Sequence, residues 1–93
     1  MKQFELDLEK LLNKFNFELI EHQYFEKAFG NIVLKIRYQE NELTFVTDRG
    51  EISCNDKLLC THEYMKNENK TTPQKLLEQI ELELVAIQKQ TKN

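Results

Sequence analysis

Proline and glycine are scarce in this sequence, which has one proline and two glycines among its 93 residues. These two residue types are the strongest local signals for turns and chain breaks. The chain therefore has few positions that interrupt a regular element. We expect long helices and strands that are joined by short turns.

Long apolar runs are also missing. No stretch approaches the ~18 consecutive apolar residues that a membrane-spanning helix needs. The segment Met1–Glu5 shows no apolar core of the kind that marks a secretory signal. We therefore expect neither export nor contact with a membrane.

A surplus of basic residues is absent. The chain has 13 Lys and Arg against 16 Asp and Glu, a net charge of −3, and the two signs are interspersed. Binding to nucleic acid draws most of its affinity from clustered positive charge. We therefore expect no nucleic-acid partner.

Cysteine is limited to Cys54 and Cys60. Secreted domains of this size usually rely on several disulfides. Two free thiols without a secretory signal indicate a reducing compartment, and we expect cytoplasmic localisation.

The composition that remains is that of a folded protein. Hydrophobic residues make up 40% of the chain and charged residues 31%, which is typical of a globular domain and not of a disordered segment. The length suits one domain and is short for two. We expect a single domain over residues 1–93.

Apolar periodicity predicts a helix near each end of the chain. In residues 2–14 the spacing puts five apolar side chains on one helical face: Phe4, Leu8, Leu11, Leu12 and Phe15. Asn13 or Asn16 could end this helix in the left-handed conformation.

The second predicted helix begins at Thr72-Pro73, with Thr72 as the N-cap and Pro73 in the first helical position. Its apolar stripe consists of Leu77, Ile80, Leu84 and Ile87, widened by Leu76 and Val85. Such stripes usually pack within their own domain, although a homodimer through this helix is an alternative. Residues 62–71, which are polar, are the best linker candidate.

Alternating residues predict strands between the helices. The segment Phe17–Glu21 suggests a short strand, and His22–Gly30 could extend it through a bulge or form a loop. Residues 31–38 are the clearest strand, because apolar and polar side chains alternate along it. A turn at residues 39–42, where Asn41 tolerates positive φ, leads to a strand over residues 43–47.

Two further turns follow. Asp48-Arg49-Gly50 has the chemistry of a three-residue hairpin loop with a bulge, and Glu51–Cys54 returns as a strand. Asn55-Asp56-Lys57 is the next turn signal, and Leu58–Cys60 is either a further strand or an apolar loop. The predicted fold is α+β: a helix, a three- or four-stranded antiparallel meander and a helix, with both helices on one sheet face.

Possible metal ligands gather at Cys60-Thr61-His62-Glu63. Structural zinc needs four ligands, usually in two spaced pairs, and the remaining candidates, Cys54 and His22, have no such spacing. A catalytic cysteine needs a base beside its thiol, which the sequence does not show. We expect packed cysteines, no metal site, no cofactor and no catalytic residues.

Carboxylates lie close together in the sequence at Glu40, Glu42, Asp48 and Glu51. Acid–base catalysis needs two carboxyl groups in a cleft that separates their pKa values. Because turns of a meander are usually solvated, we expect these groups to be surface charges.

The most specific local feature is Asp48-Arg49-Gly50. Its structural interpretation is turn chemistry. Its functional interpretation is that Arg49 projects from a loop tip as an anchor for a protein partner, since Arg is enriched at interface hot spots.

The segments Phe29-Gly30-Asn31-Ile32-Val33-Leu34 and Phe45-Val46-Thr47-Asp48-Arg49-Gly50-Glu51 resemble a strand-and-hairpin pattern of small uncharacterised bacterial α+β proteins. Some of those proteins are similar to immunity proteins of toxin–immunity systems. The resemblance covers about residues 15–55, and neither helix adds to it. It implies a protein-binding role and carries over no catalytic residue.

The sequence thus favours a small non-enzymatic protein-binding domain, immunity-like or regulatory, with another protein as its partner. Asp48, Arg49, Gly50 and the sheet edges are the candidate contact region. The first alternative is a homodimer that binds a small molecule between sheet and helices. The second alternative is a metal- or thiol-dependent enzyme.

Overall fold

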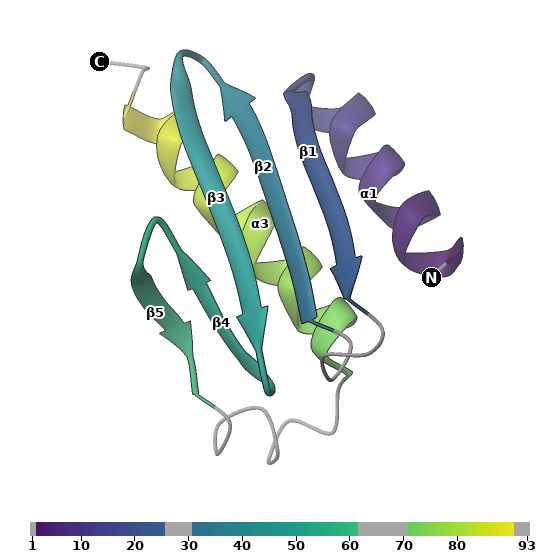
Figure 1. Ribbon diagram of the computed structural model, residues 1–93. Helices are drawn as coiled ribbons and strands as arrows, with labels where there is room; N and C mark the ends of the chain where they lie inside the picture. The colour runs from purple at the N-terminus through teal and green to yellow at the C-terminus, as the bar shows by residue number, and fades with distance from the viewer. Residues whose placement is uncertain (1, 26–30, 62–70, 91–93) are drawn as a thin grey trace.

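The computed structural model describes residues 2–25, 31–61 and 71–90. The order of elements is α1 (Lys2–Phe15), β1 (Glu18–Phe25), β2 (Asn31–Tyr38), β3 (Asn41–Asp48), β4 (Glu51–Cys54), β5 (Lys57–Cys60) and α3 (Thr72–Gln90). The strands form one antiparallel sheet in the order β1-β2-β3-β4-β5 (Figure 1). The predicted α+β class is confirmed, with five strands in place of three or four.

Helix α1 ends at one of its two predicted terminators, Asn16. Asn16 adopts a φ of 60°, and its N–H donates to the carbonyl of Leu12 at 2.7 Å. A left-handed Asn after the last helical residue is a common helix terminator. Of the two asparagines considered, Asn16 therefore closes the helix, one residue later than predicted.

Strand β1 continues past the predicted Glu21 to Phe25, because a bulge resets its alternation. Leu19 lies opposite Ile36 and Glu21 lies opposite Lys35, so Ile20 is the extra residue. After the bulge, His22 and Tyr24 share the face of Leu19. Of the two possibilities for residues 22–30, the bulged strand is correct up to Phe25, and residues 26–30 lie outside the described residues.

The meander turns by three two-residue loops, Gln39-Glu40, Arg49-Gly50 and Asn55-Asp56. All six residues have positive φ, from 50° to 88°, as in the type I′ turns that match the twist of a hairpin. The prediction of a three-residue loop with a bulge at residues 48–50 is therefore wrong, because Asp48 pairs with Glu51.

The first of these turns also differs from the prediction. Positive φ falls on Gln39 and Glu40, and Asn41 is the first residue of β3. Asn41 supports the turn by donating from Nδ2 to the carbonyls of Tyr38 at 3.3 Å and Gln39 at 3.0 Å. Leu58–Cys60 lies in strand β5, which settles the alternative between strand and loop.

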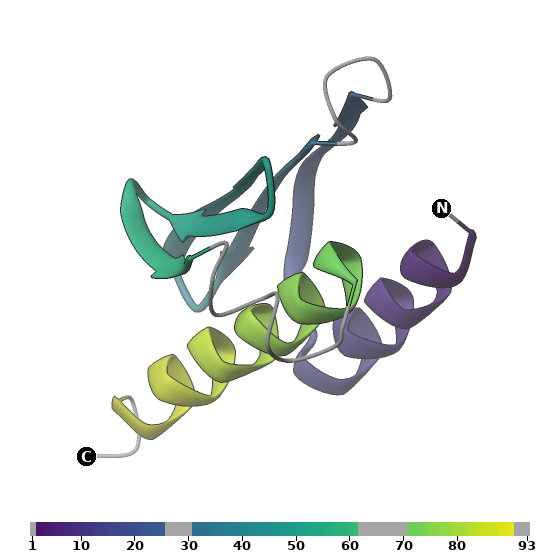
Figure 2. The same ribbon diagram turned by 90° about the horizontal axis from the view of Figure 1, so that it is seen from below.

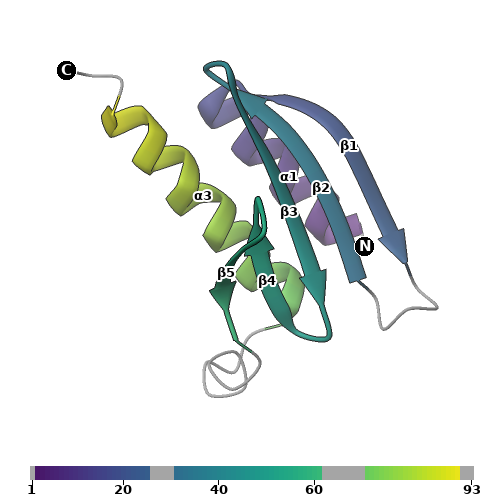
Figure 3. The ribbon, with the colours of Figure 1, turned by 60° about the vertical axis from the view of Figure 1, so that its left-hand side comes forward.

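Both helices cover one face of the sheet, and no element described by the structure covers the other (Figure 2). In Figure 3, α1 lies behind β2 and β3, α3 runs beside the sheet, and the short β4–β5 hairpin overlaps the first turns of α3. Every second residue of β2 points to the helices, which confirms the predicted alternation. The core consists of Phe4, Leu8, Phe15, Phe17, Ile32, Leu34, Ile36, Tyr38, Leu43, Phe45, Ile52, Cys54, Cys60, Leu76, Ile80, Leu84 and Ile87.

Helix α3 begins with a capping box one residue earlier than predicted. The Thr71 hydroxyl accepts from the N–H of Gln74 at 3.3 Å, and Gln74 Oε1 accepts from the N–H of Thr71 at 3.0 Å. These reciprocal bonds make Thr71 the N-cap. Thr72 is then the first helical residue and Pro73 the second, which corrects both assignments.

The buried stripe of α3 is centred on Leu76, Ile80, Leu84 and Ile87. Leu77 and Val85 are only partly buried at its margins. The near-heptad stripe therefore packs within its own chain.

Candidate functional site

The predicted contact residues form the tight turn between β3 and β4. Asp48 and Glu51 are paired across the hairpin, and Arg49 and Gly50 make the turn itself. Arg49 is exposed at the tip, with a φ of 51°. A non-glycine residue pays a steric cost in this region of backbone space, so the turn depends on support from elsewhere.

That support comes from Asn31, the first residue of β2. Its Oδ1 accepts from the N–H of Arg49 at 3.1 Å, and its Nδ2 lies 3.4 Å from Asp48 Oδ1. Asn31 thus satisfies the turn amide that the positive φ exposes. The side chain of Asn31 therefore fixes the β3–β4 hairpin to strand β2.

A second side-chain bond lies beside the first. The Cα register of β2 and β3 ends at the pair Val33 and Val46. Beyond it the Thr47 hydroxyl accepts from the N–H of Ile32 at 2.8 Å, and both residues are fully buried. We call Asn31 and Thr47 the clasp, because together they hold the hairpin to β2 where the ladder has ended.

The hairpin presents one cation, Arg49, between two exposed carboxylates, Asp48 and Glu51. This set can form charge-assisted hydrogen bonds with a protein surface. Sequence analysis predicted Asp48, Arg49 and Gly50 as contact residues, treated Glu51 only as a surface charge, and missed the clasp. The one available signal was an asparagine at a strand start, and it did not reveal a contact 18 residues further along the chain.

The two cysteines lie on adjacent strands and are both buried as free thiols. Burial, with a smaller contribution from Glu83, raises the pKa of Cys54 from 9.0 to about 11. The thiol is therefore protonated near neutral pH, and a protonated thiol is a poor nucleophile. This supports packing as the role of Cys54.

His22 packs against α1. Its ring lies 5.5 Å from that of Phe4, and its buried Nε2 has no hydrogen-bond partner among the described residues. Within the part of the chain that the structure describes, no group of three or more His, Cys, Asp or Glu could hold a metal ion. His62 and Glu63 lie outside the described residues.

The four carboxylates considered from the sequence are all exposed, and they are divided between two ends of the sheet. Glu40 lies in the turn before β3. Glu42 lies 3.6 Å from Arg37, which also contacts Glu18 at 3.5 Å. Asp48 and Glu51 lie in the hairpin, so the structure does not bring the four together.

The two edges of the sheet differ in length and in exposed apolar surface. Strand β5 has four residues, begins with Lys57 and exposes one large apolar side chain, Leu58. Strand β1 has eight residues and exposes four such side chains. Edge strands are usually kept short or charged because their free backbone groups can pair with another chain. Only β5 follows that rule closely.

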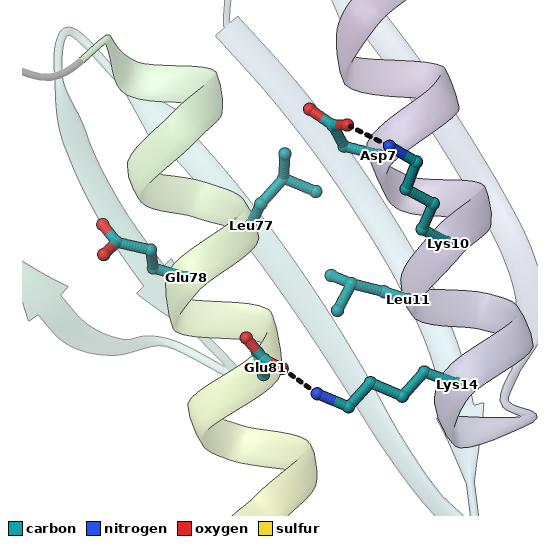
Figure 4. A pocket seen from close by; sticks show the side chains of 7 residues that line it. All are labelled: Asp7, Lys10, Leu11, Lys14, Leu77, Glu78 and Glu81. Atoms are coloured by element: carbon teal, nitrogen blue, oxygen red, sulfur yellow. Dashed lines mark hydrogen bonds and ion pairs between the residues drawn. The ribbon is translucent and has the colours of Figure 1, made fainter.

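A groove runs between α1 and α3, as Figure 4 shows. One part of it, of about 350 Å³, has Leu11 and Leu77 between the helices, and Lys14 closes it by an ion pair with Glu81 at 2.8 Å. A second part, of about 300 Å³, lies towards the N-terminal ends of both helices and shares Asp7 and Leu77 with the first. The groove faces solvent, whereas the space between helices and sheet is filled by the core.

Lys75 is a buried charged residue that sequence reasoning missed. It is 6% exposed on the first turns of α3, and its Nζ lies 3.6 Å from Glu78 Oε2. From the sequence alone, a lysine four residues after the N-cap of a helix is expected to be exposed. Residue 75 lies about 100° around the helix from Leu76, outside the apolar stripe, so the helical pattern gave no signal of its burial.

Comparisons of the chain with protein-family models, with curated proteins and with solved structures gave no match. The resemblance to immunity-like proteins therefore stays a prediction. Over the described residues, neither helix combines the length and the apolar character that crossing a bilayer requires.

Proposed function

We propose that the chain is a small protein-binding domain with an immunity-like or other regulatory role, which acts without catalysis in the cytoplasm. The observation that carries this proposal is the uncovered side of the sheet. One face has no covering element among the described residues, and β1 exposes large apolar side chains at its edge. Exposed apolar groups rimmed by polar ones are typical of interaction sites.

The hairpin supports the same function. The clasp holds the backbone of the turn through the N–H of Arg49 and also holds the side chain of Asp48, so less backbone entropy is lost when the turn meets a partner. An exposed arginine at the tip of such a turn can form bidentate bonds with a carboxylate. The partner surface would then include at least one Asp or Glu opposite Arg49.

Affinity capture from the native cells, followed by reconstitution with purified components, tests the proposal. We expect one protein to be recovered repeatedly and to form a defined complex in light scattering. The variant Arg49→Glu should weaken that complex about tenfold or more, as hot-spot arginines do. The matched variant Lys89→Glu, at the exposed end of α3, should leave it unchanged. Repeated capture without any specific partner contradicts the proposal.

The groove between α1 and α3 favours one alternative, a small-molecule-binding domain. Its leucine floor and charged rim have the mixed character of ligand sites. A thermal-shift screen of metabolite classes tests it, and a stabilisation lost in Leu77→Gln is the expected result. No response in any class contradicts this alternative.

A further inference from the structure

The outer edge of β1 is the least protected backbone in the described sheet. The strand contains no Lys, Arg or Pro, and its large side chains Leu19, Ile20, Tyr24 and Phe25 are 40–45% exposed. The usual protective devices of edge strands are lysine, proline, shortness and bulges. Strand β1 has the bulge at Ile20 and the carboxylates of Glu18 and Glu21, and Glu21–Phe25 is a regular stretch of free edge with one charged residue.

The apolar side chains lie on both sides of this stretch. Tyr24 lies opposite Ile32 and so shares the helix-covered face, whereas Phe25 lies opposite Asn31 on the open face. An added strand alternates its side chains between the two faces. A strand added to β1 would therefore contact Tyr24 on the helix-covered face and Phe25 on the open face, while its backbone pairs with that of β1.

The charge of the edge is negative. Glu18 is paired with Arg37 at 3.5 Å, but Glu21 accepts from the amide of Gln23 on its own strand. Lys35 lies opposite Glu21 in the register, yet no ion pair joins the two side chains. The carboxylate of Glu21 is thus available to a cation on the open face beside β1.

The area of the edge distinguishes between occupants. At the observed exposures the four side chains offer roughly 300 Å² of surface, at the low end of the patches that are functional in monomers. A standard complex of two folded domains buries about 800 Å² per partner, so this edge alone suits one short added segment and is too small to hold two copies of the folded chain together. A second copy would also bring its own Glu18 and Glu21 into the contact, without any basic residue from β1.

We propose that Glu21–Phe25 of β1 is a β-augmentation site, which accepts an extended segment of a partner protein with a basic residue facing Glu21 and apolar residues facing Tyr24. Main-chain pairing supplies the affinity in this mode, and side chains supply the specificity. This inference rests on the proposed protein-binding function and identifies the kind of partner segment.

A synthetic peptide tests the site directly. The probe is the acetylated, amidated peptide Thr-Val-Lys-Val-Lys-Val-Thr, titrated into the ¹⁵N-labelled chain. We expect amide shifts at Glu21–Phe25 that are lost when alternate peptide nitrogens are methylated, because methylation removes the pairing donors. Shifts confined to β5 or to the groove between α1 and α3, or no shifts at millimolar peptide, overturn the inference.

Reversing the charge at residue 21, and separately in the peptide, tests whether Glu21 pairs with a basic residue of the bound segment. Glu21→Lys should weaken binding of the lysine peptide about two- to fivefold and favour the matching peptide with Glu in place of Lys, as expected for exposed charge pairs. Glu21→Gln, which keeps the side-chain shape, should show a smaller loss. The matched variant Glu9→Lys makes the same charge change at an exposed position of α1, away from the sheet edge, and should behave like the parent chain. Equal effects of Glu21→Lys and Glu9→Lys overturn the proposed pairing.

The failures of the two proposals are distinguishable. If the peptide binds at β1 but native capture finds no partner, the edge chemistry holds and the proposed function fails. If a captured partner contacts only the hairpin and the peptide does not bind, the function holds and the β1 site fails. Concentration-dependent shifts of β1 amides without peptide show a second copy as the occupant and also overturn the inference.

Discussion

Replacing Thr47 by valine isolates the buried half of the clasp. Valine keeps the shape of threonine but cannot accept the N–H of Ile32, which lies at 2.8 Å from the hydroxyl in a fully buried position. An orphaned buried donor costs about 1–3 kcal/mol. The added apolar group offsets up to ~0.8 kcal/mol, so Thr47→Val should lower the free energy of unfolding by about 0.2–2 kcal/mol, with a midpoint of ~1 kcal/mol.

Urea unfolding measures this change, with Thr44→Val as the matched control. Thr44 lies on the open face, and its hydrogen bond to Asn55 Oδ1, at 2.8 Å, comes from its backbone N–H. The control should stay within ~0.5 kcal/mol of the parent chain. Amide exchange of Ile32 should also become faster in Thr47→Val alone. If Thr47→Val is as stable as Thr44→Val, the hydroxyl is not the required partner and the clasp argument is refuted.

Three further predictions follow from local geometry. Glu40→Gly should raise the free energy of unfolding by about 0.5–1 kcal/mol, because φ at this turn is 70°; a loss of stability in chemical denaturation would contradict the type I′ assignment. Thr71→Ala should cost about 1 kcal/mol through the lost cap, measured by thermal unfolding, and an unchanged Tm would contradict it. Because the folded pKa of Cys54 is raised to about 11, stability should fall between pH 9 and 11, where the unfolded thiol ionises first. Cys54→Ala should flatten that fall, and an equal slope in both proteins would contradict the burial argument.

The elements were predictable wherever one residue pattern dominated. The stripe from Phe4 to Phe15 and the alternation in residues 31–38 each match a single period, and both elements form where predicted. The ends of the helices were harder to predict. Thr71 and Thr72, for example, are equally good N-cap residues for α3 when the sequence alone is considered. Only the reciprocal bonds with Gln74 distinguish between them.

The turns were harder to predict because pairing between strands decides them. Gln39 and Glu40 are weak turn formers by residue preference, yet the register that pairs Tyr38 with Asn41 leaves two residues for the loop. Two residues in a right-twisted hairpin require positive φ at both positions. The bulge at Ile20 is similar, since it is visible only as a change in which residues face Ile36 and Lys35.

The sequence predicted where the turn of the candidate site lies, but not which residues hold that turn in place. The dipeptide Arg49-Gly50 marks a turn from its glycine, and the structure confirms a turn there. The clasp residues Asn31 and Thr47 act across the sheet, so their role depends on strand order. The exposed edge of β1 likewise depends on which strand is outermost, which the sequence leaves open.

Hydrogen exchange of the whole chain, with and without its captured partner, tests the central claim most directly. The account predicts that the partner protects the peptide covering Phe17–Phe25, with added protection at residues 48–51 if the hairpin also takes part. Protection confined to α1 and α3, or exchange that is identical with and without the partner, would contradict binding through the uncovered side of the sheet.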